Sequence, residues 1–172
     1  MRVNLNANEE RRGDFDPANP AETANFSSGF TVYDARGYQR IMTIFWRKAR
    51  TQAWSWHALW GWDNPSGFEY ARGTVEFDGV GRLVKQTTGR SALPIGLDDE
   101  ELPVRFDFEG TTGTYDPSSS NAVHYDGRAG SMVIEHDVDS SGLVRAITSV
   151  GTREPMGTLA FAFGNERDGY EV

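Results

Sequence analysis

The sequence predicts an all-β protein, with antiparallel sheets that form a flattened barrel or a sandwich-like domain with long loops. Its apolar residues fall in short runs that alternate with polar residues, which is the period of a half-buried strand. Clusters of Gly, Asp, Asn and Ser separate these runs, as turns separate antiparallel strands. The 172 residues include 19 Gly and 7 Pro, a composition that favours turns over long helices.

Three hairpins follow from this pattern. They pair residues 30–34 with 41–46, 73–77 with 82–85, and 132–135 with 143–147. Further strands are expected at 104–109, where Val104, Phe106 and Phe108 alternate with charged residues, and at 156–163, where Leu159, Phe161 and Phe163 share a face.

One helix competes with these strands. Apolar residues at 45, 49, 53 and 56 have helical spacing, but the aromatic residues crowded into 44–59 favour strands. Residues 9–28, 87–101 and 111–130 are rich in turn formers and are expected to be loops.

Composition excludes several classes of protein. The net charge of −8 and the pI near 4.9 argue against nucleic acid or an anionic membrane as the main partner, because both demand a cationic face. The absence of cysteine removes disulfides, thiol catalysis and cysteine-based zinc sites. Residues 1–12 lack the apolar core of a secretory signal, and no apolar run is long enough to span a bilayer.

Four tryptophans form the most conspicuous local feature. In a strand, Trp54, Trp56, Trp60 and Trp62 would project from one face, because side chains alternate. Such a ladder can be one wall of the core, an exposed platform for sugar rings, or a contact with another copy. We expect the ladder to be mostly buried. Four exposed rings would not contribute the free energy of burial, which is large compared with the total stability of a domain.

No catalytic, cofactor or metal site is expected. Residues 137–142 imitate the start of a calcium loop, but Thr148 stands where the bidentate carboxylate should be, so a hairpin turn is the better interpretation. The histidines His57, His124 and His136 have no second ligand at a suitable spacing. The acidic residues 98–101, and the pair Asp107 and Glu109, carry no recognisable base, nucleophile and orienting partner for a hydrolase.

Taken in order, several segments resemble the middle part of bacterial flagellar hook proteins. The resemblance covers most of the chain, matches poorly at 86–130, and departs from the family pattern at Ala35, at Val150-Gly151 and in the tryptophans at 56, 60 and 62. The segments are residues 3–7, 15–20, 25–37, 42–48, 75–83, 139–145 and 157–165. The motif residues are Thr31, Val32, Tyr33, Asp34, Gly37, Trp54, Gly81, Leu83, Gly142, Gly157 and Phe163.

The resemblance implies a structural module of the flagellar hook, the flexible joint that transmits torque through adjustable contacts between subunits. Residues 1–130 would be an outer β domain, and 131–172 a β hairpin segment that packs on it or belongs to the neighbouring inner β domain. Implied partners are other copies of the protein and the hook cap and junction proteins, and the implied location is the extracellular hook, reached through the flagellar secretion apparatus.

The apolar heptad helices that end whole hook proteins are not recognisable in this sequence. We therefore expect an excised outer portion that is monomeric in isolation. The alternative from another class is a carbohydrate-binding β module that uses the tryptophan ladder.

Overall fold

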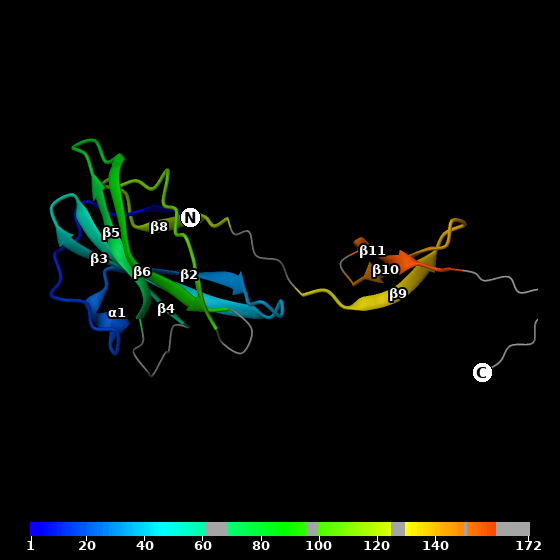
Figure 1. The fold of residues 1–172 in the computed structure, drawn as a ribbon. Helices are drawn as coiled ribbons and strands as arrows, with labels where there is room; N and C mark the ends of the chain where they lie inside the picture. Colours follow the sequence, from blue (N-terminus) through cyan, green and yellow to red (C-terminus); the bar gives the residue numbers. More distant parts are fainter. Residues whose placement is uncertain (61–68, 96–99, 125–129, 150, 161–172) are drawn as a thin grey trace, which may run out of the picture. The chain divides into compact units, whose positions relative to one another are not determined.

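The computed structural model describes residues 1–60, 69–95, 100–124, 130–149 and 151–160. The chain divides into two compact units, Met1–Ala129 and Gly130–Val172. The predicted all-β class is confirmed, since antiparallel sheets dominate the described residues and their one α-helix is four residues long (Figure 1). No described helix is long and apolar enough to cross a membrane.

The larger unit contains a six-stranded antiparallel sheet in the order β2-β3-β4-β5-β6-β7, together with a small sheet made of β1 and β8. Within the described residues neither sheet closes on itself, so the sandwich-like form of the prediction describes the fold. The elements of this unit are β1 Arg2–Asn4, α1 Pro20–Thr23, β2 Phe26–Tyr33, β3 Gln39–Arg50, β4 Ala53–Trp60, β5 Glu69–Phe77, β6 Leu83–Pro94, β7 Glu101–Pro103 and β8 Ser119–Ala122.

The core lies on one face of the six-stranded sheet, because the strand register brings apolar side chains opposite one another there. Trp46 pairs with Trp56 across β3 and β4, and Ile44 pairs with Ala58. Val3 and Leu5, from β1 and the residue that follows it, are buried in the same core. The buried members of the core are Val3, Leu5, Met42, Ile44, Trp46, Trp54, Trp56, Ala58, Ala71, Val75, Phe77, Leu93, Phe106 and Phe108.

The opposite face of the sheet is covered in part by the segment that leads to β2. Phe15 packs against a smaller buried cluster of Ala24, Phe45 and Leu59. α1 begins after Asn19 with a proline in its first turn, where the missing N–H costs nothing. The segment 9–28 is therefore less irregular than expected, since it also contains the first residues of β2.

Two expected loops contain strands. β6 continues to Pro94 instead of ending near residue 85, and it pairs with β5 at Thr74 with Thr87 and Ala71 with Ser91. β8 lies within 111–130 and pairs with β1. These stretches are rich in Ser, Thr and Gly, and their few apolar residues, such as Leu93 at the end of β6, do not alternate over enough positions to reveal a strand.

The prediction of a strand at 104–109 is wrong, since these residues belong to none of the strands. Their burial alternates as predicted, with Phe106 and Phe108 buried and the charged residues between them exposed. The side chain of Gln86 takes the place of a neighbouring strand: its Nε2 donates to the Phe106 carbonyl oxygen at 2.6 Å, and its Oε1 accepts from the Phe108 N–H at 3.0 Å.

The smaller unit is a three-stranded antiparallel sheet in the order β11-β10-β9. Its strands are β9 Val133–Val138, β10 Leu143–Thr148 and β11 Arg153–Thr158. The third predicted hairpin is confirmed, whereas the last strand begins earlier than expected and Phe161 and Phe163 lie outside the described residues. Ala146 and Thr148 are buried, but six large apolar side chains of this unit are exposed: Met132, Val133, Ile134, Val138, Met156 and Leu159.

A glycine on β5 makes room for an indole ring of the core. A Cβ on Gly73 would lie 2.0 Å from the Thr87 carbonyl oxygen and 2.8 Å from Trp56 Nε1. One of these atoms belongs to the backbone of β6, the paired strand. The two strands could move apart to admit a Cβ only by breaking the hydrogen bonds between β5 and β6. Gly73→Ala should therefore lower the free energy of unfolding by ~3 kcal/mol, measured by urea denaturation with tryptophan fluorescence.

Gly29→Ala on β2 is the matched control. A Cβ at Gly29 would meet its nearest atom, the Met42 carbonyl oxygen, at 3.8 Å, which is an ordinary contact. This variant should be as stable as the parent or up to ~1 kcal/mol more stable. Equal urea midpoints for the two variants would contradict the packing argument.

Candidate functional site

The tryptophan face of β4 is a wall of the core. Trp54 and Trp56 are 1% and 0% exposed, and Trp60 is half-buried at the end of the strand. Trp60 lies near Tyr70, with ring centroids 6.0 Å apart, and the Arg40 guanidinium lies 6.0 Å from the centroid of its ring. Trp62 lies outside the described residues. The described part of the ladder therefore offers no flat, exposed platform for a sugar.

The outer face of the same strand carries a hydrogen-bonded Ser–His–Glu arrangement. His57 Nε2 lies 3.0 Å from Ser55 Oγ, and His57 Nδ1 contacts Glu69 Oε1. Phe15 stacks on the imidazole with ring centroids 3.9 Å apart. The sequence gives Ser55 and His57 a common face by alternation, but Glu69 and Phe15 come from distant segments that the sequence alone does not bring there.

This arrangement has the order of a catalytic triad but lacks the rest of an active site. Ser55 is only 9% exposed and sits in β4, which pairs with strands on both sides. The backbone N–H groups of β4 beside its hydroxyl are therefore committed to the sheet, and the Arg47 guanidinium, 3.5 Å from Ser55 Oγ, is held by Asp14 and the Gly13 carbonyl oxygen. The geometry supports a structural role, in which His57 holds Phe15 and its segment against the sheet.

The calcium-like sequence at residues 137–142 is a hairpin turn. Asp139 Oδ1 accepts hydrogen bonds from the Ser141 hydroxyl and from the backbone N–H groups of Ser141 and Leu143, at 2.9 and 3.2 Å for the two amides. Asp139 Oδ2 lies 2.8 Å from the Arg145 guanidinium. Gly142 closes the turn with φ of 82°, a conformation suited to glycine. Within the described residues, no group of three or more His, Cys, Asp or Glu could hold a metal ion.

The motif residues lie in strands and turns. In the turn after β2, Asp34 Oδ1 accepts from the N–H groups of Arg36 and Tyr38 at 3.0 and 2.9 Å, and Gly37 has φ of 77°. Gly81 has φ of 81° and closes the turn before Leu83. Thr31, Val32 and Tyr33 lie in β2, Gly157 lies in β11, and Phe163 lies outside the described residues.

The other candidate carboxylates form no acid–base pair in the described structure. Glu101 makes an ion pair with Arg90, with oxygen–nitrogen distances of 2.6 and 2.8 Å. Asp98 and Asp99 lie outside the described residues. Asp107 and Glu109 are exposed, and Asp107 Oδ1 accepts from the Glu109 N–H in a local turn. His124 is exposed on the rim of the pocket described next, and His136 is exposed on β9.

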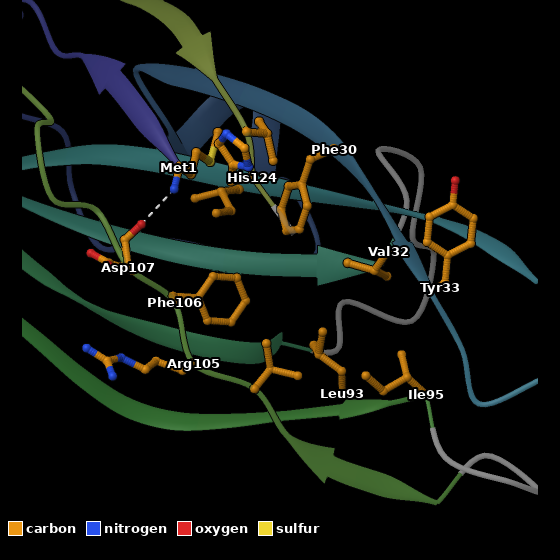
Figure 2. Close-up of a pocket in the computed structure, with 13 residues that line it drawn as sticks. Met1, Phe30, Val32, Tyr33, Leu93, Ile95, Arg105, Phe106, Asp107 and His124 are labelled. Carbon is orange, nitrogen blue, oxygen red and sulfur yellow. Dashed lines mark hydrogen bonds between the residues drawn. The ribbon is translucent and has the colours of Figure 1, made fainter. Parts of the chain in front are cut away.

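A pocket opens at the end of the six-stranded sheet where β2 approaches β6 (Figure 2). Its volume is about 620 Å³, and its wall is mainly apolar, with Phe30, Leu93 and Phe106 among the lining residues. The Ala35 N–H donates to the Ile95 carbonyl oxygen at 2.5 Å, which ties the two sides together. We call this cavity the apolar pocket. Its lining residues are Met1, Phe30, Val32, Tyr33, Ile44, Leu93, Ile95, Val104, Arg105, Phe106, Asp107, Val123 and His124.

At the opposite end of the sheet a buried lysine fastens the N-terminal segment. Lys48 is 6% exposed, and its Nζ donates to the Ala7 carbonyl oxygen and lies 5.8 Å from the Trp54 ring centroid. Burial lowers the pKa of Lys48 from its ordinary value, although Glu9 opposes that shift. The Lys48 side chain therefore connects the N-terminal segment to the sheet beside the Trp54 ring.

The Asp139 turn predicts a pH dependence. The hydrogen bond from the Ser141 side chain, with the bond from its backbone N–H, lowers the pKa of Asp139 to about 2. Because the folded pKa lies below the unfolded value, this contribution to stability is complete above pH ~4 and is lost as pH falls through the folded value. Ser141→Ala should raise the pKa in a carboxyl carbon NMR titration, whereas Ser140→Ala should leave it unchanged. An unaltered titration in Ser141→Ala would contradict the assignment.

The tryptophan wall predicts unequal costs of truncation. Trp54→Ala should lower the free energy of unfolding by ~3–5 kcal/mol, because the ring is fully buried. Trp60→Ala should cost less, since Trp60 is only half-buried. Urea denaturation measures both values, and added polysaccharide should leave the tryptophan emission unchanged. A Trp54→Ala variant with the parent's midpoint, combined with quenching by glycan, would favour the carbohydrate-binding module instead.

Comparisons with known proteins identify the larger unit. Residues 4–128 match the family model of the flagellar basal body protein FlaE D2 domain. The chain is also similar to the crystal structure of Helicobacter pylori flagellar hook protein FlgE2, with 13% sequence identity and a TM-score of 0.41, over 76% of this chain and 31% of that one. No curated protein matches the sequence. Because the family model covers more than half of its length, the chain belongs to the flagellar basal body protein FlaE D2 domain family.

Proposed function

We propose that this chain is the outer part of a structural subunit of the bacterial flagellar hook, the flexible joint that transmits torque from motor to filament. The observation that carries the proposal is the match of residues 4–128 to the D2 domain family. The partners in this role are other copies of the parent protein and the hook cap and junction proteins. The location is outside the cell, after export by the flagellar secretion apparatus.

The surface of the six-stranded sheet suits adjustable contacts. Ion pairs join strands on its outer face at Arg50 with Glu76, 3.1 Å apart, and at Lys85 with Glu76, 4.0 Å apart. Exposed pairs of this kind each contribute ~0–1 kcal/mol and exchange readily with water. A surface of such pairs can slide against a neighbour at little cost, whereas a dry apolar surface would fix one geometry.

The described structure favours this role over the two alternatives. Trp54 and Trp56 are buried, so the described part of the ladder offers no platform for carbohydrate, and Ser55 lies in a central strand without the access that hydrolysis requires. A structural subunit needs neither feature.

We assign residues 131–172 to the neighbouring inner β domain of the subunit. The family match ends at residue 128, one residue before the larger unit ends. The described residues of the smaller unit bury few apolar side chains and expose Ile134 and Met132 by 64% and 75%. A three-stranded sheet needs a covered apolar face for independent stability, so other segments of the parent subunit are expected to cover this one.

Immunogold electron microscopy of flagella from the source bacterium tests both assignments. An antibody against the exposed strand residues 84–90 should label the hook and leave the rod and the filament bare. An antibody against residues 153–158 should label hook protein only after acid dissociation, because the inner domain would cover that strand in the assembly. Label on the filament or the rod would refute the hook assignment, and label of 153–158 on intact hooks would refute the inner-domain assignment alone.

A further inference from the structure

The apolar pocket and an exposed aromatic residue lie at opposite ends of the same sheet. The pocket is at the end where β2 finishes at Tyr33 and β6 finishes at Pro94. The turn between β5 and β6, residues 78–81, is at the other end of these strands. The Gly113 N–H donates to the Gly81 carbonyl oxygen at 2.9 Å, which places the segment with Tyr115 beside that turn.

Tyr115 and Val80 form an exposed apolar pair. Their side chains are 76% and 73% exposed, although both residues also line a small cavity beside Trp54. We call this pair the knob. A solvent-exposed Tyr is a low-entropy contact residue, because its large ring has few rotatable bonds.

The pocket can receive such a ring. Figure 2 shows Phe30, Leu93 and Phe106 around a common space, and the cavity volume of about 620 Å³ exceeds that of one phenol ring. Phe106 packs edge-on to Phe30 with centroids 6.3 Å apart, and its own exposed fraction is 8%. The aromatic wall is therefore formed before any partner arrives, which lowers the entropic cost of docking.

The charges beside the two features are complementary. Asp116 follows Tyr115 and is exposed, and Arg105 is exposed on the rim of the pocket. Within the described residues neither side chain makes an ion pair. Asp107 also lies at the pocket, where its Oδ1 accepts from the Glu109 N–H, and Asp78 shares the turn beside Tyr115 with Arg82.

We propose that the knob of one copy inserts into the apolar pocket of a second copy, with Asp116 facing Arg105. Because knob and pocket are different surfaces at opposite ends of one sheet, the contact is head-to-tail and can repeat along a line of copies. The inference rests on the proposed function and deepens it, since it names the surfaces through which the outer domains meet. A contact of this size is weak alone, with a Kd of roughly 0.1–1 mM, and leaves the chain monomeric at micromolar concentration.

Sedimentation velocity and amide NMR spectra of the whole chain, from ~10 μM to ~1 mM, test the contact. Signals near Tyr115 and near the pocket should shift together as concentration rises. Tyr115→Ser and Arg105→Glu should each weaken association tenfold or more, as the loss of a central anchor or of its charge partner does. Val84→Ser is the matched control, because Val84 is 62% exposed on β6 and belongs to neither surface, and it should associate like the parent.

Mixing the two weakened variants tests the head-to-tail geometry. Tyr115→Ser keeps an intact pocket and Arg105→Glu keeps an intact knob, so their mixture should form a 1:1 complex that does not grow. The charge reversal Asp116→Arg combined with Arg105→Glu should restore association.

Four results would overturn the proposal: no concentration dependence in the parent, a mixture that stays monomeric, equal weakening by Val84→Ser, or NOEs at low concentration between the pocket and residues 130–172 of the same chain. Each is independent of whether antibodies locate the protein in the hook.

Discussion

The packing of two indole rings against Phe108 is the interaction on which the larger unit depends. Trp46 and Trp56 meet this phenyl ring edge-on, with centroids 4.9 and 5.1 Å away and interplanar angles of 69° and 68°. Both indole Nε1 atoms are buried without a hydrogen-bond partner among the described residues, at a cost of ~1–3 kcal/mol each. The burial of both rings and their aromatic contacts must exceed that cost. Gly73 gives Trp56 its space, and Gln86 holds Phe108 in place.

Features set by local alternation could be predicted from the sequence. The period of two places Trp54 and Trp56 on one face of β4, and the structure has them there. The far half of β6 could not be predicted, because most of its residues are Thr, Gly, Arg and Ser, and the single buried Leu93 gives no alternation that separates a strand from a loop. In the segment around Phe106 the alternating burial was predictable, but a strand was not formed. Its backbone hydrogen bonds at Phe106 and Phe108 are made by the side chain of Gln86, which no local pattern predicts.

The candidate sites depend on contacts that the sequence does not encode locally. Glu69 reaches His57 through the pairing of β4 with β5, and Phe15 reaches it from a segment more than forty residues away. The resulting Ser–His–Glu geometry would suggest hydrolysis if distances alone were considered. Its place in a central strand decides otherwise, because access and free backbone donors are as necessary as the side chains. The apolar pocket likewise arises where β2 and β6 approach, and sheet curvature has no signature in a single strand.

The distribution of interaction strengths explains how such a domain can serve in a flexible joint. The core gathers its aromatic rings on one face, where removing a single buried ring costs several kcal/mol. The outer face and both ends carry exposed ion pairs and small apolar contacts, each weaker than one buried ring. In the proposed role, contacts between copies that are made of such pairs would break under load before the buried core does. The close-packed aromatic core is the part of the domain that keeps its geometry, as an element that passes force from one copy to the next must do.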